Sequence, residues 1–175
     1  MNQPEIMEDV NGRKIVMIPE IIFFNKQNIS WDKVEIYLKR YIDKSIEMID
    51  SHDVICIGTK FPDEYSSSRY TRITKGARAK AKANAAQGVC EMIKIATEKE
   101  FRENHKEKHT EDANNGWYYY LTRFALPIYD NNVRTDEYKC YSARLVVNCT
   151  SKGKMYLYDI VDIKKEASNP LKTNE

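Results

Sequence analysis

The sequence predicts an α+β fold in which N-terminal helices pack on a C-terminal antiparallel meander sheet. Apolar residues recur at helical spacing through residues 31–49 and 75–100. Residues 117–163 instead alternate between apolar and polar side chains and are interrupted by turn-forming residues. A chain of 175 residues can bury a substantial core within one domain. We therefore expect a single domain over residues 1–175.

The composition limits the classes of function. Charged residues make up 31% of the chain and hydrophobic residues 42%, which indicates a folded protein in water. The net charge is only +2, so any phosphate-binding surface must be local. We expect neither a secretory signal nor a membrane span, because no apolar stretch is long enough. The scattered cysteines favour free thiols in the reducing cytoplasm, and no metal or cofactor is predicted.

Local signals predict the elements of the first half. Asn11-Gly12 indicates an N-terminal β-hairpin whose second strand covers residues 14–18. Ser30 is expected to cap a core-facing helix over residues 31–49. A short strand at residues 53–58 and a polar loop at residues 61–74 are expected to follow.

The helix expected at residues 75–100 has an unusual apolar face. Toward the N-terminus that face continues as three cations, Lys75, Arg78 and Lys82. Three unpaired cations cannot be buried in a core. We therefore expect the first turns to line a rim where cations contact acids or phosphates; a solvated basic end is the alternative.

Residues 98–111 are highly charged and are expected to be helical, with His105 and His109 on one face. Their pattern, HKEKH, lacks the acid placement of the zinc motif HExxH, so no metal site is predicted. Gly116 is expected to turn the chain into the first strand of the sheet.

The meander is expected to contain strands at residues 117–128, 138–148 and 154–163, joined by turns at 130–132 and 150–153. Alternation places Tyr141, Ala143, Leu145 and Val147 on the core face and Arg144 on the other. Asp159 shares the core face with Leu157, Val161 and Ile163, and Arg123 is its expected partner. The tail after about residue 166 is expected to be loose.

Four stretches carry a family resemblance: KAKANAAQG (80–88), KxKHxxDAxxGWY (106–118), RFALP (123–127) and LYDIVDIKKE (157–166). They resemble a family of small bacterial proteins. The chain is also similar to large polyvalent protein-associated domain three, a module of long phage and conjugative-element proteins. Such modules have been compared with the fold shared by barnase, EndoU, colicin and RelE nucleases. The resemblance thus implies an α+β module of a mobile element. Tyr119 stands where relatives often carry arginine, so a phosphate contact of that arginine would be missing here.

The first functional hypothesis is metal-independent RNA cleavage, in which the 2′-hydroxyl attacks the adjacent phosphate. This reaction needs an acid, a base and a cation for the developing charge. His109 is the predicted acid or base and Arg123 the predicted cation, because a guanidinium fork matches two phosphate oxygens. The remaining candidates are supporting groups at the catalytic centre (His105, Tyr118 and Arg144) and RNA-binding cations (Lys75, Arg78 and Lys82).

The second hypothesis is a non-catalytic module of a mobile element that binds a protein partner or modulates host defence. Tyrosines are concentrated in the sheet half, and their amphipathic rings suit contact surfaces as well as base stacking. The tyrosines concerned are Tyr118, Tyr119, Tyr120, Tyr129, Tyr138, Tyr141, Tyr156 and Tyr158. RNA and a protein are thus the two predicted partner classes, and no oligomeric state is predicted.

Overall fold

The computed structural model describes residues 3–25, 27–102, 116–167 and 170–171 of a mixed α+β fold. The described strands are β1 (Glu5–Glu8), β2 (Lys14–Met17), β3 (Ser45–Glu47), β4 (Val54–Cys56), β5 (Thr97–Arg102), β6 (Trp117–Asp130), β7 (Val133–Cys149) and β8 (Met155–Lys165). The helices are α1 (Trp31–Leu38), α2 (Phe61–Ser67), α3 (Arg69–Ile73), α4 (Ala77–Ala85) and α5 (Val89–Ile95), with short 3₁₀ turns at Lys39–Tyr41 and Ala86–Gly88. None of these described helices is long and apolar enough to cross a membrane.

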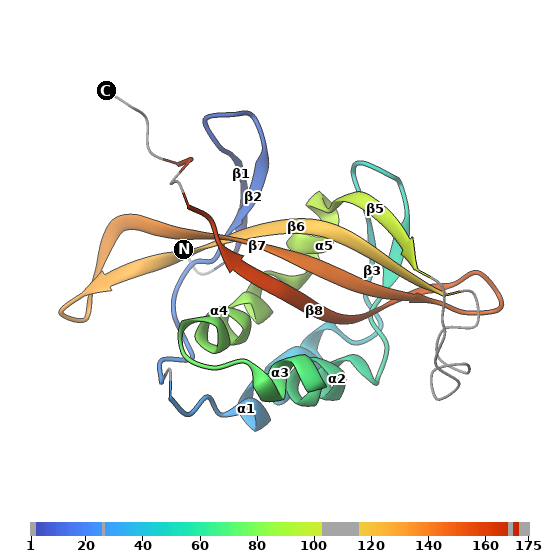
Figure 1. Cartoon of the computed structure of the whole chain (residues 1–175), viewed down its shortest axis with the longest axis horizontal. Coiled ribbons are helices and arrows are strands. Elements are labelled where there is room, and N and C mark those ends of the chain that lie inside the picture. Colours follow the sequence, from blue (N-terminus) through green and yellow to red (C-terminus); the bar gives the residue numbers. More distant parts are fainter. Residues whose placement is uncertain (1–2, 26, 103–115, 168–169, 172–175) are drawn as a thin grey trace.

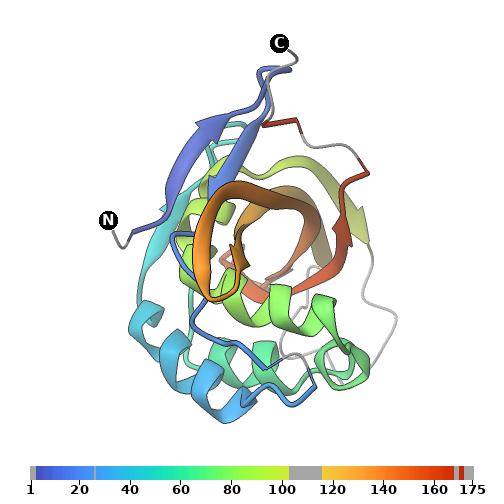
Figure 2. The same ribbon diagram turned by 90° about the vertical axis from the view of Figure 1, so that its left-hand side faces the viewer.

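The strands form one sheet in the order β1-β2-β6-β7-β8-β4-β3, and β5 also pairs with β6. Figure 1 shows α1 to α4 gathered on one side of the long strands β6, β7 and β8. The end-on view in Figure 2 shows that this sheet curls. Residues from both layers form the main core.

The antiparallel meander is confirmed, because β6 pairs with β7 and β7 with β8 in sequence. Asn131 and Asn132 form the first turn with φ of 49° and 64°, a left-handed conformation that asparagine tolerates. The four residues predicted for the core face of β7 are all buried: Tyr141, Ala143, Leu145 and Val147. The N-terminal hairpin of β1 and β2 is also confirmed.

The simple division into N-terminal helices and a C-terminal antiparallel sheet is wrong. Five strands precede β6, and two of them pair in parallel with the meander: β2 with β6 and β4 with β8. The sheet is therefore mixed, and helical segments connect strands that lie far apart in it. Parallel neighbours need such crossovers.

Two of the predicted elements between residues 31 and 74 are also wrong. The helix expected to reach residue 49 ends near Tyr41, because Asp43 adopts a left-handed φ of 73° and the chain then forms β3. The expected polar loop is helical as α2 and α3. Pro62 favours the first turn of α2, and the Ser68 hydroxyl accepts a bond from the Thr71 amide at the start of α3.

The helix predicted over residues 75–100 is broken into α4, a 3₁₀ turn and α5, and β5 follows. At the break a Cβ on Gly88 would lie 2.8 Å from Ile18 Cδ1 and 2.9 Å from Val16 Cγ1. Glycine therefore allows this turn to pack directly on β2 and the residue after it. The helix expected at residues 98–111 is wrong for its described part, because residues up to Arg102 belong to β5.

A buried ion pair joins the helices to the sheet. Lys82 of α4 is fully buried, and its Nζ lies 2.6 Å from Asp159 Oδ1 of β8 and 2.6 Å from Thr71 Oγ1. Burial lowers the pKa of Lys82 and raises the pKa of Asp159, and their mutual attraction opposes both shifts. Lys82, not the predicted Arg123, is thus the partner of Asp159.

We expect Lys82→Met to reduce the free energy of unfolding by about 3–5 kcal/mol, because it leaves a buried carboxylate without its cation. Adding Asp159→Leu should recover much of this loss, since the unpaired charge is then removed. Urea unfolding measures both effects. Arg78→Met, at an exposed position of the same helix, is the control and should change stability by less than about 0.5 kcal/mol. An unchanged urea midpoint for Lys82→Met would contradict this role of the pair.

Candidate functional site

Arg123 is buried in ion pairs with acids of the protein and does not lie in an open catalytic site. Only 4% of its side chain is exposed, and its Nε and Nη2 donate to both carboxylate oxygens of Glu166 at 2.7 and 3.0 Å. Nη2 also lies 2.9 Å from Asp9 Oδ2, and Nη1 donates to the Lys14 carbonyl at 3.2 Å. The guanidinium, which we call the Arg123 clamp, therefore fastens the N-terminal hairpin and the end of β8 to β6.

The electrostatics of the clamp favour its charged form. Hydrogen bonds to Glu166 raise the pKa of Arg123. Burial opposes ionisation of Asp9, but the amides of Arg13 and Asn11 together with Arg123 lower its pKa overall. The guanidinium of Arg123 is therefore already paired with two carboxylates of the protein itself, those of Glu166 and Asp9.

The other predicted site residues do not converge. Tyr118 lies on the core side of β6, with its ring 5.3 Å from the ring of Phe101. Arg144 lies on the opposite face, 33% exposed and 3.9 Å from Glu100. Lys75 and Arg78 are exposed, whereas Lys82 is buried and does not line a rim. His105 and His109 lie outside the described residues.

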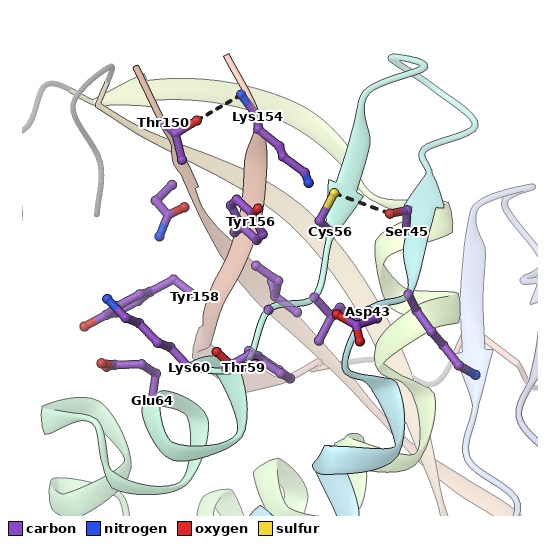
Figure 3. Close-up of a pocket in the computed structure, with 16 residues that line it drawn as sticks. Asp43, Ser45, Cys56, Thr59, Lys60, Glu64, Thr150, Lys154, Tyr156 and Tyr158 are labelled. Atoms are coloured by element: carbon purple, nitrogen blue, oxygen red, sulfur yellow. Dashed lines mark hydrogen bonds between the residues drawn. The ribbon is translucent and has the colours of Figure 1, made fainter. Parts of the chain in front are cut away.

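A pocket of about 450 Å³ opens where β4 and β8 separate (Figure 3). The two strands pair in parallel only at Ile55 with Met155 and Cys56 with Tyr156. Beyond Cys56 the chain turns through Gly58 into α2, while β8 continues along β7. A Cβ on Gly58 would lie 3.3 Å from the Tyr156 ring, so glycine allows the ring to pack against this turn.

Strand register aligns one side of this pocket. A single row of directly paired residues crosses six strands, so its side chains project from the same face. From β5 to β3 the row is Arg102, Trp117, Asn148, Tyr156, Cys56 and Ser45. The last four line the pocket. At its far side the Ser45 hydroxyl donates to Cys56 Sγ at 3.4 Å.

Cations and aromatic rings meet in the pocket. Figure 3 shows Lys60 beside Tyr158 on one side and Lys154 near Tyr156 on the other. A hydrogen bond with Tyr156 raises the pKa of Lys154, which keeps its ammonium protonated. Both tyrosines are half-buried, and the Tyr158 ring packs edge-on to Trp117 at 4.9 Å. Three lysines and two acids line the pocket in all: Lys44, Lys60, Lys154, Asp43 and Glu64.

Asn148 is the buried polar residue of the pocket. It is 9% exposed, and its Oδ1 has no hydrogen-bond partner among the described residues. The amide lies between Trp117 and Tyr156 in the cross-strand row.

A larger groove of about 630 Å³ lies between the N-terminal hairpin and the first residues of β7. Its lining includes Glu5, Glu8 and Asp136, against one arginine, Arg134. This surplus of carboxylates repels phosphate, so the groove is a poor match for an anionic ligand. The described residues also contain no group of three or more His, Cys, Asp or Glu side chains placed to hold a metal ion.

The pocket contains residues that the sequence reasoning did not single out. Asn148, Lys60 and Lys154 were missed because no local pattern marks them. Tyr156 and Tyr158 were included only as members of a tyrosine-rich half. The useful signal is the register across six strands, which depends on pairings between distant parts of the chain.

The chain matches no family model, no curated protein and no solved structure. The resemblance stated from the sequence therefore stays a prediction.

We expect Arg123→Lys to lower the free energy of unfolding by about 2–3 kcal/mol, because lysine keeps the charge but cannot make the two-pronged contact with Glu166. Thermal and urea unfolding measure this loss. Arg144→Lys is the matched control and should stay within about 0.5 kcal/mol, since that arginine makes only a half-exposed, long contact. Equal stability of the two variants would show that the clamp does not hold the fold.

Proposed function

We propose that the protein binds single-stranded RNA, with one nucleotide held in the pocket between β4 and β8. One observation supports this proposal: Lys60 and Lys154 line a pocket of nucleotide size together with the rings of Tyr156 and Tyr158. Aromatic rings bind unpaired bases by stacking, and ammonium groups bind phosphate.

The charge distribution agrees with a short binding site. The net charge of +2 is too small for a long phosphate-binding footprint. Cations concentrated in one pocket supply attraction where the ligand sits, while the acidic groove at the other end of the sheet disfavours nucleic acid. The scattered cysteines favour a reducing cytoplasm, where RNA is abundant.

RNA cleavage is the second candidate function, and one observation favours it. Arg102 pairs directly with Trp117, so the described ends of segment 103–115, which carries His105 and His109, lie together. Trp117 is in turn opposite Asn148 and against Tyr158, both of which line the pocket. His109 is seven positions after Arg102 in the sequence, a reach of up to about 25 Å.

In this second proposal His109 transfers the proton during attack of the 2′-hydroxyl on phosphate. The cation that stabilises the developing charge comes from Lys60 or Lys154 instead of Arg123, because the clamp holds Arg123 between two carboxylates. The resemblance to nuclease-like modules supports this reaction class. It adds no residue role beyond those stated above.

The binding proposal is tested with a labelled single-stranded RNA and fluorescence anisotropy at several salt concentrations. The double variant Lys60→Ala/Lys154→Ala should bind at least about tenfold more weakly. Its salt dependence should also be shallower, by a slope of about 0.7 for each phosphate that the variant no longer neutralises.

Lys75→Ala/Arg78→Ala is the matched control, because it removes the same charge from exposed positions outside the pocket. It should retain nearly full affinity. Equal losses of affinity in the two double variants would mean that RNA is attracted by general charge and not by the pocket. Absence of RNA binding even in low salt would favour the protein-partner hypothesis.

The cleavage proposal is tested with the same RNA in chelator. His109→Ala should cut about 10²–10⁴-fold more slowly than wild type while keeping its melting temperature and RNA affinity, because an acid or base contributes by that factor. Products ending in a cyclic phosphate identify attack by the 2′-hydroxyl. Wild-type protein that binds RNA but leaves it intact is a binding module, and equal cutting by both proteins excludes His109 from the reaction.

A further inference from the structure

Asn148 presents an unexplained polar atom at the centre of the cross-strand row. The residue is 9% exposed and lines the pocket, and its Oδ1 is buried without a hydrogen-bond partner among the described residues. Buried polar side chains nearly always have a partner, because a buried acceptor that has given up water destabilises the fold. An unpartnered acceptor in the wall of a pocket therefore points to a ligand group that completes it.

The surroundings separate Asn148 from the other buried atoms that lack a hydrogen bond. Asp9 Oδ2 lies 2.9 Å from the Arg123 guanidinium, so its charge is compensated inside the fold. Ser66 Oγ and Glu91 Oε2 belong to residues that do not line the pocket. Asn148 alone of these four described atoms lies with the lysines and tyrosines of the pocket.

Because Asn148 Oδ1 is a hydrogen-bond acceptor, it can contact only certain groups of a nucleotide. An amide oxygen repels phosphate oxygens, which carry no proton, but it accepts from a neutral hydroxyl or amino group. Nucleotides offer two such donors, the ribose 2′-hydroxyl and the amino groups of adenine, cytosine and guanine. A phosphate bound by the lysines would leave the sugar or base for Asn148.

We propose that Asn148 is the specificity-determining residue of the pocket, whose Oδ1 accepts a hydrogen bond from a neutral donor of the bound nucleotide. This assignment rests on the proposed RNA binding and deepens it. If the donor is the 2′-hydroxyl, the pocket selects RNA over DNA, since that hydroxyl is the group by which proteins distinguish the two. If the donor is a base amino group, the pocket selects bases.

The test uses Asn148→Leu, which keeps a similar volume but removes the acceptor, with two readouts. The affinity for RNA should fall about five- to tenfold, as expected for removal of one hydrogen bond. The melting temperature of the free protein should rise or stay unchanged, because the asparagine oxygen has no partner within the described fold. A merely structural asparagine would instead lower the melting temperature when replaced, and that result would overturn the assignment.

Titration with a set of RNA and DNA oligonucleotides identifies which nucleotide group donates the hydrogen bond. Wild type and Asn148→Leu are titrated with oligoadenylate, oligocytidylate and oligouridylate, each as RNA and as DNA. A sugar contact gives wild type a preference for RNA that is absent from the variant; a base contact gives a preference for adenine or cytosine over uracil that is absent from the variant in both backbones. A variant that binds every oligomer as wild type does would overturn the assignment while leaving RNA binding intact. Wild type that binds none of them would overturn the proposed function itself.

Two further variants complete the experiment. Thr135→Ala is the control on the same strand as Asn148 but outside the pocket; its hydroxyl already donates to the Ile128 carbonyl, so affinity should stay within about twofold. Asn148→Asp keeps an acceptor of the same shape and should preserve the sugar or base preference even though its charge weakens phosphate binding overall. Disappearance of the preference in Asn148→Asp would contradict a role as acceptor, and this readout is independent of the leucine variant.

Discussion

The ion pair between Lys82 and Asp159 is the contact on which the layered structure depends. Two opposite charges without access to water are tolerated only when each has close partners, so the pair fixes α4 against β8 within narrow limits. The same lysine orients α2, because the Tyr65 hydroxyl donates to the Lys82 carbonyl and its ring lies 4.5 Å from the ammonium. The chain entering α2, including Lys60 and Phe61, forms one wall of the pocket. A core interaction thus sets the shape of a surface site.

Four cations in the described part of the chain are of two kinds that sequence alone does not distinguish. Lys82 and Arg123 are buried with acids from distant parts of the chain, Asp159 in one case and Asp9 with Glu166 in the other. Lys60 and Lys154 sit at element boundaries with their side chains in solvent. Burial requires compensation, so the first pair is committed to the fold, whereas the second pair is exposed and lines the pocket.

Local chemistry explains what could be predicted. The turns at Gly12 and at Asn131 with Asn132 fix their hairpins through backbone preferences, and the alternation of β7 follows from its pleat. The helix expected to reach residue 49 ends earlier, because strand pairing between β3 and β4 outweighs the helical spacing of the apolar residues in this stretch. The pocket could not be predicted for a similar reason. Only strand register brings Ser45, Asn148 and Tyr156 into one row, and residue type was the only feature that marked Tyr156. The two histidines lie outside the described residues and remain a prediction.

The Arg123 clamp also determines how the protein carries mechanical load. The Val10 amide donates to the Pro170 carbonyl at 2.9 Å, and Asp9 and Glu166 meet at the same guanidinium, so segments near both ends of the chain are joined at one place. Glu166 follows the last residue of β8, whereas Tyr156 of the pocket is near its first, roughly 30 Å away along the strand. Tension applied through the two ends therefore acts on the clamp before it reaches the pocket. Such an arrangement allows the domain to be tethered at both ends within a longer polypeptide while the geometry of the pocket stays undisturbed.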